Sequence, residues 1–415
     1  MRRFFTKHKN KTFVCLILIC VFAFFFILPR VFSVHYVSLA EMPLFANPTD
    51  ATPKEEVFVP SYVSTPEPVK GLYITSWTAS DHGLRGALVK LIDDTELNTI
   101  VIDIKDYSGK IVFSLDDNPT LKAFGSEEVR IKDLQGFIEE LHKKGIYVVG
   151  RIAVFQDAYF VKYRPDLAVK NKTGSAVWKD RKGISWIDPG SREYWDYIIL
   201  LAKEGRRIGF DEINFDYIRF PSDGDMQNIS YPFSSSTPKH IVIRNFFEYL
   251  RDNLVTQPQP VQGSTLNKEI QGGTLYSGDR LKISADMFGM VTTAQDDMGI
   301  GQVLEDALPY FDYVMPMVYP SHYPATFQGF KDPEAHPYEV VKFALQGGIN
   351  RANMASTTPN KIRPWLQDFG LKMTYGSAEV RAQIKATNDV GLTSWILWSA
   401  SNKYTRSALE QNPQN

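Results

Sequence analysis

Cysteine is nearly absent from this chain of 415 residues. Cys15 and Cys20 are its two cysteines, and both lie in an apolar stretch near the N-terminus. The sequence beyond residue 20 therefore contains no structural disulfide and no thiol nucleophile.

Sequence signals of several other protein classes are also missing. No basic stripe stands out in a chain of net charge −1, so we predict no nucleic-acid partner. The seven His are scattered without metal-ligand spacing, and Ser321-His322 lacks the GxSxG elbow of serine hydrolases. Asp223 and Asp225 flank Gly224, but the further oxygen ligands of a calcium loop are missing. We predict neither a metal nor a cofactor.

The N-terminal stretch has the pattern of a membrane anchor. Basic residues at positions 2, 3, 7, 9 and 11 precede an apolar run over 13–28, which 29–34 extend. Such a charge bias places the N-terminus in the cytoplasm and the remainder of the chain outside it. We predict a cytoplasmic tail (1–12), a single-pass signal anchor in the cell membrane (13–34) and an extracytoplasmic catalytic domain. The alternative is secretion after signal cleavage near Ser38-Leu39-Ala40.

Prolines follow the apolar run and then give way to a regular alternation of strand-like and helix-like segments. Residues 35–69 are rich in proline and predict a linker, 70–406 predict the folded domain, and 407–415 predict a disordered tail. The domain contains eight predicted strands, at 70–75, 99–105, 146–152, 211–216, 281–286, 313–319, 362–367 and 392–398. Amphipathic segments between them include 131–144, 192–205, 240–255 and 378–389.

Eight strands alternating with helices predict an α/β fold, a (β/α)8 TIM barrel with enlarged loops, preceded by the transmembrane helix and the linker. A doubly wound open sheet is the alternative, but no GxGxxG or Walker loop follows any predicted strand. Two segments look inserted. One, at 222–239, follows the fourth strand and predicts a wall of the cleft. The other, at 257–279, enters the fifth strand from the bottom of the barrel.

The fourth predicted strand, in the motif GFDEINFDYIRFP, is the most informative segment. Side chains alternate along a strand, so Glu212, Asn214 and Asp216 share one face and two large apolar residues share the other. This pattern suits a barrel wall whose polar face points inward, and it places Asp216 at the C-terminal mouth, where barrel enzymes keep their chemistry. A half-exposed edge strand with a surface Arg–Asp pair is the alternative.

The same alternation on the other strands brings further side chains to the mouth. They are Asp103, Lys105, Arg151, Asp286, Tyr319, Gln367 and Trp398. Carboxyl groups beside arginine and aromatic rings suit sugar chemistry. Each has a structural alternative: Asp103 with Lys105 as an ion pair, and Tyr319 with Trp398 as core aromatics.

Several motifs together resemble one protein family. They include KGLYITSW, NTIVIDIKDYSG, YVVGRIAVFQD, GFDEINFDYIRFPSDG, ISADMFG, YVMPMVYPSHY and GLTSWILWSAS, and they span the whole predicted barrel in order. This run is similar to the putative glycosyl hydrolase domain family, which is distantly similar to the α-amylase superfamily. The resemblance implies that Asp216, ending strand four, is the nucleophile and that Asp286, ending strand five, is the acid/base. It departs from that superfamily in having Asp where strand five normally ends in Glu.

These observations predict a membrane-anchored glycoside hydrolase that acts on a poly- or oligosaccharide. Neighbouring strands lie about 4.8 Å apart, which suits the ~5–5.5 Å between the carboxyl groups of retaining enzymes. Arg151 or Arg219 is expected to keep Asp216 ionised, and the loop 319–323 to contact the sugar through Tyr319 and His322. The alternative is a catalytically inert glycan-binding module at the cell surface, since a fold does not fix a function.

Overall fold

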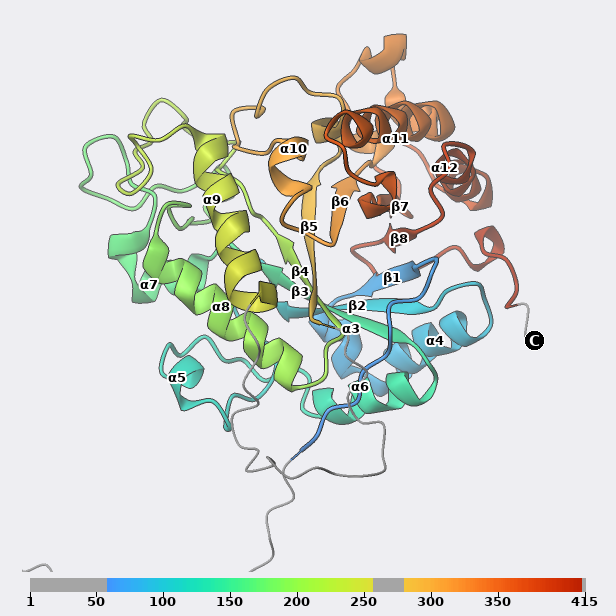
Figure 1. Ribbon diagram of the computed structural model, residues 1–415, viewed down its shortest axis with the longest axis horizontal. Coiled ribbons are helices and arrows are strands. Elements are labelled where there is room, and N and C mark those ends of the chain that lie inside the picture. Colours follow the sequence, from blue (N-terminus) through green and yellow to red (C-terminus); the bar gives the residue numbers. More distant parts are fainter. Residues whose placement is uncertain (1–57, 257–279, 413–415) are drawn as a thin grey trace, which may run out of the picture. The chain divides into compact units, whose positions relative to one another are not determined.

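Eight parallel strands close into a barrel in chain order, so that β8 pairs with β1 (Figure 1). The computed structural model describes residues 58–256 and 280–412. The strands are β1 (Lys70–Ile74), β2 (Thr99–Lys105), β3 (Tyr147–Ala153), β4 (Glu212–Asp216), β5 (Lys282–Phe288), β6 (Tyr313–Met317), β7 (Trp365–Gln367) and β8 (Trp395–Trp398). The predicted (β/α)8 barrel is confirmed.

Helices alternate with the strands; α11 and α12, for example, lie side by side next to β7 (Figure 1). The α-helices are α3 (Ser76–Ser80), α4 (His82–Asp93), α5 (Pro119–Lys122), α6 (Leu134–Lys143), α7 (Ala158–Tyr163), α8 (Arg192–Arg207), α9 (Lys239–Arg251), α10 (Leu304–Ala307), α11 (Pro337–Met354) and α12 (Ser377–Asp389). Short 3-10 turns occupy Pro165–Leu167, Gly289–Thr292, Pro320–His322, Phe327–Gly329, Pro333–Ala335, Pro359–Lys361 and Arg406–Ala408, and a π-turn follows α9 at Asp252–Thr256.

The alternation of side chains separates two apolar clusters. On β2, Ile100, Ile102 and Ile104 belong to the large cluster between strands and helices, whereas Val101 belongs to the small cluster inside the barrel. A fully buried strand of this kind reads as a continuous apolar run because both of its faces are covered. The inward position of Asp103 on the same strand follows from the same alternation.

Glycine sets the distance between α8 and the sheet. A Cβ atom added at Gly205 would lie 2.6 Å from Cδ1 of Ile104 and 3.0 Å from Cδ1 of Ile213. A larger residue would push α8 away from β2 and β4. The close packing of this helix therefore fixes the two strands that carry Asp103 and Asp216.

The folded domain extends beyond the predicted limits of 70 and 406. Val63 and Val69 pack against the apolar cluster inside the barrel, and the backbone N–H of Val63 donates to Oδ1 of Asp211 over 2.7 Å. At the other end, Leu409 is buried and Gln411 bridges to Thr95. The linker prediction and the tail prediction were wrong at these positions, because a few apolar residues close to each boundary pack onto the barrel.

Three strands, β6, β7 and β8, are shorter than predicted by two or three residues. β8 begins at Trp395 instead of residue 392. β7 begins at Trp365 instead of residue 362, next to Pro364, which lacks the N–H that a ladder needs. β6 ends at Met317, before Tyr319, which precedes a 3-10 turn.

The predicted cytoplasmic tail, signal anchor and most of the linker lie outside the described residues, as does the inserted segment 257–279. Within the part of the chain that the structure describes, we find no helix of the length and apolar character needed to cross a membrane.

Candidate active site

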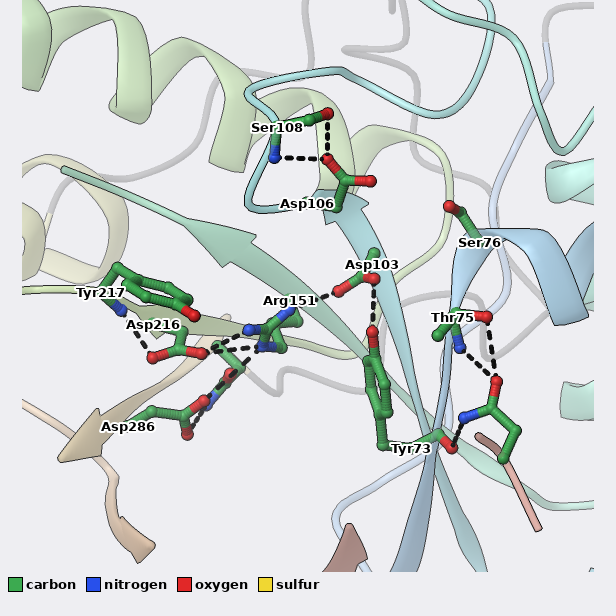
Figure 2. A network of polar contacts seen from close by, with 12 residues as sticks. Tyr73, Thr75, Ser76, Asp103, Asp106, Ser108, Arg151, Asp216, Tyr217 and Asp286 are labelled. Atoms are coloured by element: carbon green, nitrogen blue, oxygen red, sulfur yellow. Dashed lines mark hydrogen bonds and ion pairs between the residues drawn. The ribbon is translucent and has the colours of Figure 1, made fainter. Parts of the chain in front are cut away.

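Arg151 on β3 gathers three carboxyl groups at the mouth of the barrel. Its Nη1 donates to Oδ1 of Asp103 over 2.7 Å, and its Nε donates to Oδ2 of Asp216 over 3.1 Å. Nη2 of Arg151 also donates to Oδ2 of Asp216. Oδ2 of Asp286 lies 3.9 Å from Nε of Arg151. Figure 2 shows Arg151 with Asp103 on one side and with Asp216 and Asp286 on the other.

The register of the parallel strands brings these residues together. Asp103 on β2 is paired with Arg151 on β3, and Arg151 is paired with Asn214 on β4. The side chains at these positions all point inward, and Asp216 follows Asn214 by one inward step. The carboxyl groups of Asp103, Asp216 and Asp286, which the sequence placed at the mouth, therefore all lie within hydrogen-bond or ion-pair distance of Arg151.

Two N–H groups donate hydrogen bonds to the same carboxyl oxygen of Asp286. Nε1 of Trp365 donates to its Oδ1 over 2.7 Å, and Nδ2 of Asn214 donates to the same atom over 2.9 Å. The residue is 2% exposed, and burial raises the pKa of its carboxyl group well above the usual value. The negative charge of Asp216 raises this pKa further, while Arg151 and the two donors lower it. Because Oδ1 accepts both hydrogen bonds, a proton on Asp286 belongs on Oδ2.

Asp216 ends β4 where the backbone turns sharply. The N–H of Tyr217 donates to Oδ1 of Asp216 over 2.6 Å, and Tyr217 itself has a φ of +53°. Left-handed backbone is uncommon for a residue with a large side chain and is often found at functional sites. The turn leaves Asp216 7% exposed, so it is somewhat more accessible than Asp286.

The two carboxyl groups are close together. Oδ2 of Asp216 and Oδ2 of Asp286 lie 3.1 and 3.9 Å from the same Nε atom of Arg151, so their separation is at most the sum of these distances, about 7 Å. Retaining glycosidases have carboxyl groups ~5–5.5 Å apart and inverting ones about 6.5–9.5 Å. The upper limit includes the whole retaining range and only the lower end of the inverting range.

Aromatic rings line the side of the site next to β1 and β8. Tyr73 and Trp398 are stacked, with ring centroids 4.1 Å apart at an angle of 16°, and Trp398 meets Trp365 edge to face at 5.5 Å. The guanidinium carbon of Arg151 lies 5.3 Å from the centre of the Trp398 ring. Trp398 is partly exposed and thus reaches the site, as the sequence predicted.

Tyr73 is a site residue that the sequence reasoning missed. Its hydroxyl donates to Oδ2 of Asp103 over 2.7 Å, and its pKa is raised well above the usual value by burial and by the charge of Asp103. The period-two alternation of β1 would have placed it inward. Strand alternation placed Asn214 inward. The hydrogen bonds of Asn214 and Trp365 to Asp286, however, depend on the register between strands and on how far an indole reaches across the barrel.

Lys105 is not part of the site. The register shifts between Asp103 and Lys105, and the ammonium group of Lys105 donates to Oδ2 of Asp157 over 2.6 Å and to the hydroxyl of Tyr194 over 3.0 Å. A bulge of this kind changes the direction in which the following side chain points. The predicted substrate role and the alternative Asp103–Lys105 ion pair are both wrong, because Asp103 pairs with Arg151 and Lys105 with Asp157.

Arg219 lies beyond β4 and does not hold Asp216. Its guanidinium carbon lies 4.7 Å from the ring centre of Trp186 and 4.9 Å from that of Phe288, and Nη1 donates to the carbonyl oxygen of Phe220. Among the described residues, the ion-pair partner of Asp216 is Arg151, not Arg219. Of the two arginines expected to pair with Asp216, Arg151 is the one that contacts it.

The loop after β6 divides into buried and exposed rings. Tyr319 is buried in the apolar cluster inside the barrel, and the charges of Asp286 and Asp216 add to the effect of burial in raising its pKa well above the usual value. His322 is exposed, and its ring centroid lies 5.4 Å from that of Tyr319. Tyr323 is buried in the apolar cluster between strands and helices, so it packs the loop.

Gln367 is buried and supports this loop. Its Oε1 accepts from the N–H of Ser321 over 3.1 Å, and its Nε2 donates to the carbonyl oxygen of Phe369 over 2.7 Å. Both ends of the amide are engaged within the protein. The structure therefore points to a positioning role for Gln367 in place of substrate contact.

The loop 222–239 packs on the segment between β3 and α8. Ser230 pairs with Lys170, and Asp188 accepts from the N–H of Phe233 over 2.7 Å. Among the described residues, no group of three or more His, Cys, Asp or Glu is arranged to hold a metal ion.

Comparison with known proteins gives a family and a fold. The family model described as "Putative glycosyl hydrolase domain" matches residues 71–404, about four fifths of the chain. No curated protein matches the sequence.

Three solved structures illustrate the similarity. The PgaB (BpsB) glycoside hydrolase domain from Bordetella bronchiseptica is similar over 83% of this chain and 99% of its own, with a TM-score of 0.51 and 11% identity. Alpha-L-fucosidase isoenzyme 2 from Paenibacillus thiaminolyticus is similar over 82% of this chain but 46% of its own, with a TM-score of 0.50 and 12% identity. A hypothetical protein from Ruminiclostridium thermocellum has 34% identity, covers 44% of this chain and 93% of its own, and has a TM-score of 0.41. At the identities of the first two, the likeness establishes the fold alone.

Proposed function

This chain belongs to the putative glycosyl hydrolase domain family, and from that premise we propose that it hydrolyses the glycosidic bonds of a poly- or oligosaccharide by a retaining double displacement. One observation carries the proposal. A buried carboxyl group with a raised pKa, Asp286, and a more accessible carboxylate, Asp216, lie within reach of the same arginine. Two carboxyl groups whose environments push them toward different protonation states supply an acid and a nucleophile.

In the first step, an oxygen of Asp216 attacks the anomeric carbon of the sugar. Asp286 donates its proton from Oδ2 to the glycosidic oxygen, so the bond between that oxygen and the anomeric carbon breaks and the leaving sugar departs as an alcohol. The product of this step is a glycosyl ester of Asp216. Hydrogen bonds from Arg151 and from the N–H of Tyr217 fix the nucleophile in place.

In the second step, Asp286 is a carboxylate and acts as a base. It takes a proton from a water molecule while the water oxygen attacks the anomeric carbon, and the bond to Asp216 breaks. The second displacement restores the original anomeric configuration, Asp216 as a carboxylate and Asp286 as an acid. The separation limit of about 7 Å between the two Oδ2 atoms supports this route.

The arginine network supports the charges of this cycle. Arg151 bears one positive charge beside Asp216 and Asp103. Burial lowers the pKa of its guanidinium, but the charges of Asp216 and Asp103 outweigh this effect and hold that pKa well above the usual value. An ionised Asp216 next to a neutral Asp286 leaves the site with a small net negative charge, which suits the positive charge that develops on the sugar ring in an oxocarbenium-like transition state.

The N-terminal residues carry a second part of the proposal. We propose that residues 13–34 anchor the chain in the membrane and hold the barrel outside the cytoplasm, with cleavage near Ala40 as the alternative. The support is the basic flank followed by an apolar run. Membrane fractionation of the native chain, with protease added to intact cells, tests it: an anchored extracytoplasmic barrel sediments with membranes and is digested from outside.

The hydrolase proposal is tested by incubating the full-length chain in detergent with a panel of polysaccharides and measuring new reducing ends. Proton NMR of the first product then gives its anomeric configuration. Retention is expected, and early formation of the inverted anomer would contradict the double displacement. Binding of a polysaccharide without any product would favour the inert glycan-binding module.

A further inference from the structure

An exposed tryptophan lies on the rim of the barrel next to β1. Trp77 follows β1 by three residues and is 63% exposed. The guanidinium carbon of Arg130 lies 4.5 Å from the centre of its ring, so a cation covers one face of the indole. An exposed ring with a charged group stacked on one side leaves its other surface open to a ligand.

The arginine behind this ring is fixed in place. Nη1 of Arg130 donates to Oδ2 of Asp106 and, over 3.0 Å, to Oγ of Ser76, and its Nε donates to Glu128 over 2.8 Å. Asp106 is itself held, because its Oδ1 accepts from both the N–H and the hydroxyl of Ser108. Trp77 is therefore presented by a rigid support, which lowers the entropic cost of using it for binding.

This support is continuous with the candidate active site. Ser76 lies just beyond β1, which carries Tyr73, and Asp106 lies just beyond β2, which carries Asp103. Figure 2 shows Ser76 and Asp106 past the ends of these two strands, on the same side of the network as Asp103. The charge of Asp106 also contributes to the raised pKa of Asp103. A second exposed ring, Tyr107, follows Asp106 directly and is 58% exposed.

We infer that Trp77, braced by Arg130, is a sugar-binding platform at a distance from the cleavage point, and that the substrate is a polysaccharide long enough to reach both. The inference rests on the proposed function. Cleavage takes place between β4 and β5, and β1 lies three strand spacings of about 4.8 Å from β4, which is longer than one sugar ring. Only a chain of several sugar units fills both places.

Indole is suited to this task because its flat apolar face matches the C–H face of a pyranose. Such a contact tolerates different sugars in the chain, since it uses ring faces in place of specific hydroxyl groups. The platform thus favours long substrates over short ones without fixing which sugar is cleaved. We expect the groups around Asp216 and Asp286 to determine which sugar is cleaved.

The test compares binding and turnover by the full-length chain in detergent. For binding, we compare two proteins, the inactive Asp216→Asn variant and the double variant Asp216→Asn with Trp77→Ala. Each is run in gels that contain hydroxyethylcellulose, laminarin, glycol chitin, soluble starch or dextran, and retardation by the polymer is measured. At least one polymer is expected to retard Asp216→Asn, and Trp77→Ala is expected to raise the apparent Kd for it about tenfold, which is typical of an aromatic contact of about 1.4 kcal/mol. Trp77→Phe is expected to restore most of the affinity.

For turnover, the ratio of kcat/KM on the polymer to kcat/KM on an aryl monoglycoside is expected to fall about tenfold in Trp77→Ala. Met354→Ala is the matched control, since Met354 is 77% exposed at the end of α11 and is remote from the mouth. Met354→Ala is expected to change neither the ratio of the two kcat/KM values nor the retardation in the polymer gels. The melting temperature of Trp77→Ala shows whether the variant folds.

Equal retardation of the two inactive proteins by each polymer would overturn the inference, and so would the failure of all five polymers to retard Asp216→Asn. Retardation that depends on Trp77, without reducing ends from the unaltered chain, would uphold the platform and overturn the proposed hydrolysis. The two failures are therefore distinguishable.

Discussion

The interior of the barrel contains an arginine–carboxyl cluster at each end, and the same strand contributes to both. At the mouth, Asp216 of β4 shares Arg151 with Asp103 and Asp286. At the bottom, Arg363 is the one ion-pair partner of Glu212 of β4 among the described residues, with distances of 2.9 and 3.1 Å from Nη1 to the two oxygens of Glu212.

The two clusters differ in the number of carboxyl groups for each arginine. Glu212 and Arg363 are both fully buried, and their opposite charges balance each other. Three carboxyl groups around one guanidinium cannot all ionise at low cost, so one of them keeps a proton. Burial raises the pKa of Asp286 and the charge of Asp216 raises it further, so Asp286 is the group that we expect to keep the proton. An unbalanced cluster at an accessible end suits acid–base chemistry, whereas a balanced and closed cluster suits stability.

The largest expected effect is the loss of activity on removing the nucleophile at the mouth. Asp216→Asn keeps the shape of the side chain but removes its charge, and we expect kcat/KM to fall at least about 10⁴-fold, as is typical of a covalent catalyst. We expect the free energy of unfolding to change by no more than about 1 kcal/mol, because Arg151 keeps Asp103 as a partner. Reducing-end assays and denaturant unfolding measure the two quantities. A variant with near-full activity would remove Asp216 from the mechanism.

The matching change at the bottom should have the opposite effect. Glu212→Gln leaves Arg363 as a buried charge without a counter-charge, and we expect the free energy of unfolding to fall by about 3 kcal/mol. We expect kcat/KM per folded molecule to be unchanged. Denaturant unfolding followed by tryptophan fluorescence gives the first value. If Glu212→Gln lowered activity without loss of stability, the division between the two ends of the barrel would be wrong.

The pH dependence of activity should report the acid at the mouth. In the proposed mechanism Asp286 acts as an acid when protonated, so we expect kcat/KM to fall as the pH rises through its raised pKa. The indole N–H of Trp365 stabilises the charged form of Asp286. Trp365→Phe removes this donor, so we expect the pKa of Asp286 to rise and the alkaline limb of the profile to move to higher pH.

Trp395→Phe is the control for this shift. Trp395 is a fully buried residue of β8, but it belongs to the outer apolar cluster and does not contact Asp286 in the described structure. We expect its alkaline limb to stay at the pH of the unaltered enzyme. An alkaline limb that moved to lower pH in Trp365→Phe would show that Asp286 is not the group that titrates.

Much of this comparison could be predicted from the sequence, because strand alternation is a local property. It placed Asp103, Arg151, Asp216 and Asp286 inward, and it put Glu212 on the same face as Asp216. The position of Lys105 could not be predicted, because a register shift after Asp103 turns the side chain toward Asp157. Bulges arise from the packing of neighbouring strands, which no single strand pattern records.

Contacts across the barrel could not be predicted from the sequence either. The indole of Trp365 hydrogen-bonds Asp286 on a strand that is not its neighbour, so the contact depends on the width of the barrel and the reach of the side chain. For the same reason the sequence offered both Arg151 and Arg219 as partners of Asp216. The direct contact of Arg151 and the packing of Arg219 among aromatic rings settle that choice.

The smallest expected effects come from two tyrosines that occupy equivalent roles at the two ends. Tyr73 donates to Asp103 over 2.7 Å at the mouth, and Tyr147 donates to Glu212 over 3.0 Å at the bottom. Tyr73→Phe leaves Asp103 with one donor fewer and so raises its pKa, which weakens the negative charge beside Arg151. We expect kcat/KM to fall a few-fold, about 1 kcal/mol in the barrier. The free energy of unfolding should also fall, by about 1.5–3 kcal/mol, because Asp103 is buried and loses a hydrogen bond.

Tyr147→Phe should lower stability to a similar extent but leave activity unchanged. The hydroxyl group that it removes donates to a buried carboxylate, and hydrogen bonds to charged groups contribute about 1.5–3 kcal/mol to stability. We expect the free energy of unfolding to fall by about that amount and kcat/KM per folded molecule to stay constant. The two variants differ from the native chain by one hydroxyl group each, so steady-state kinetics and denaturant unfolding of the pair compare the ends directly. Equal losses of activity in both variants would mean that the two clusters are coupled through β4, and that the balanced cluster at the bottom helps to position the nucleophile at the mouth.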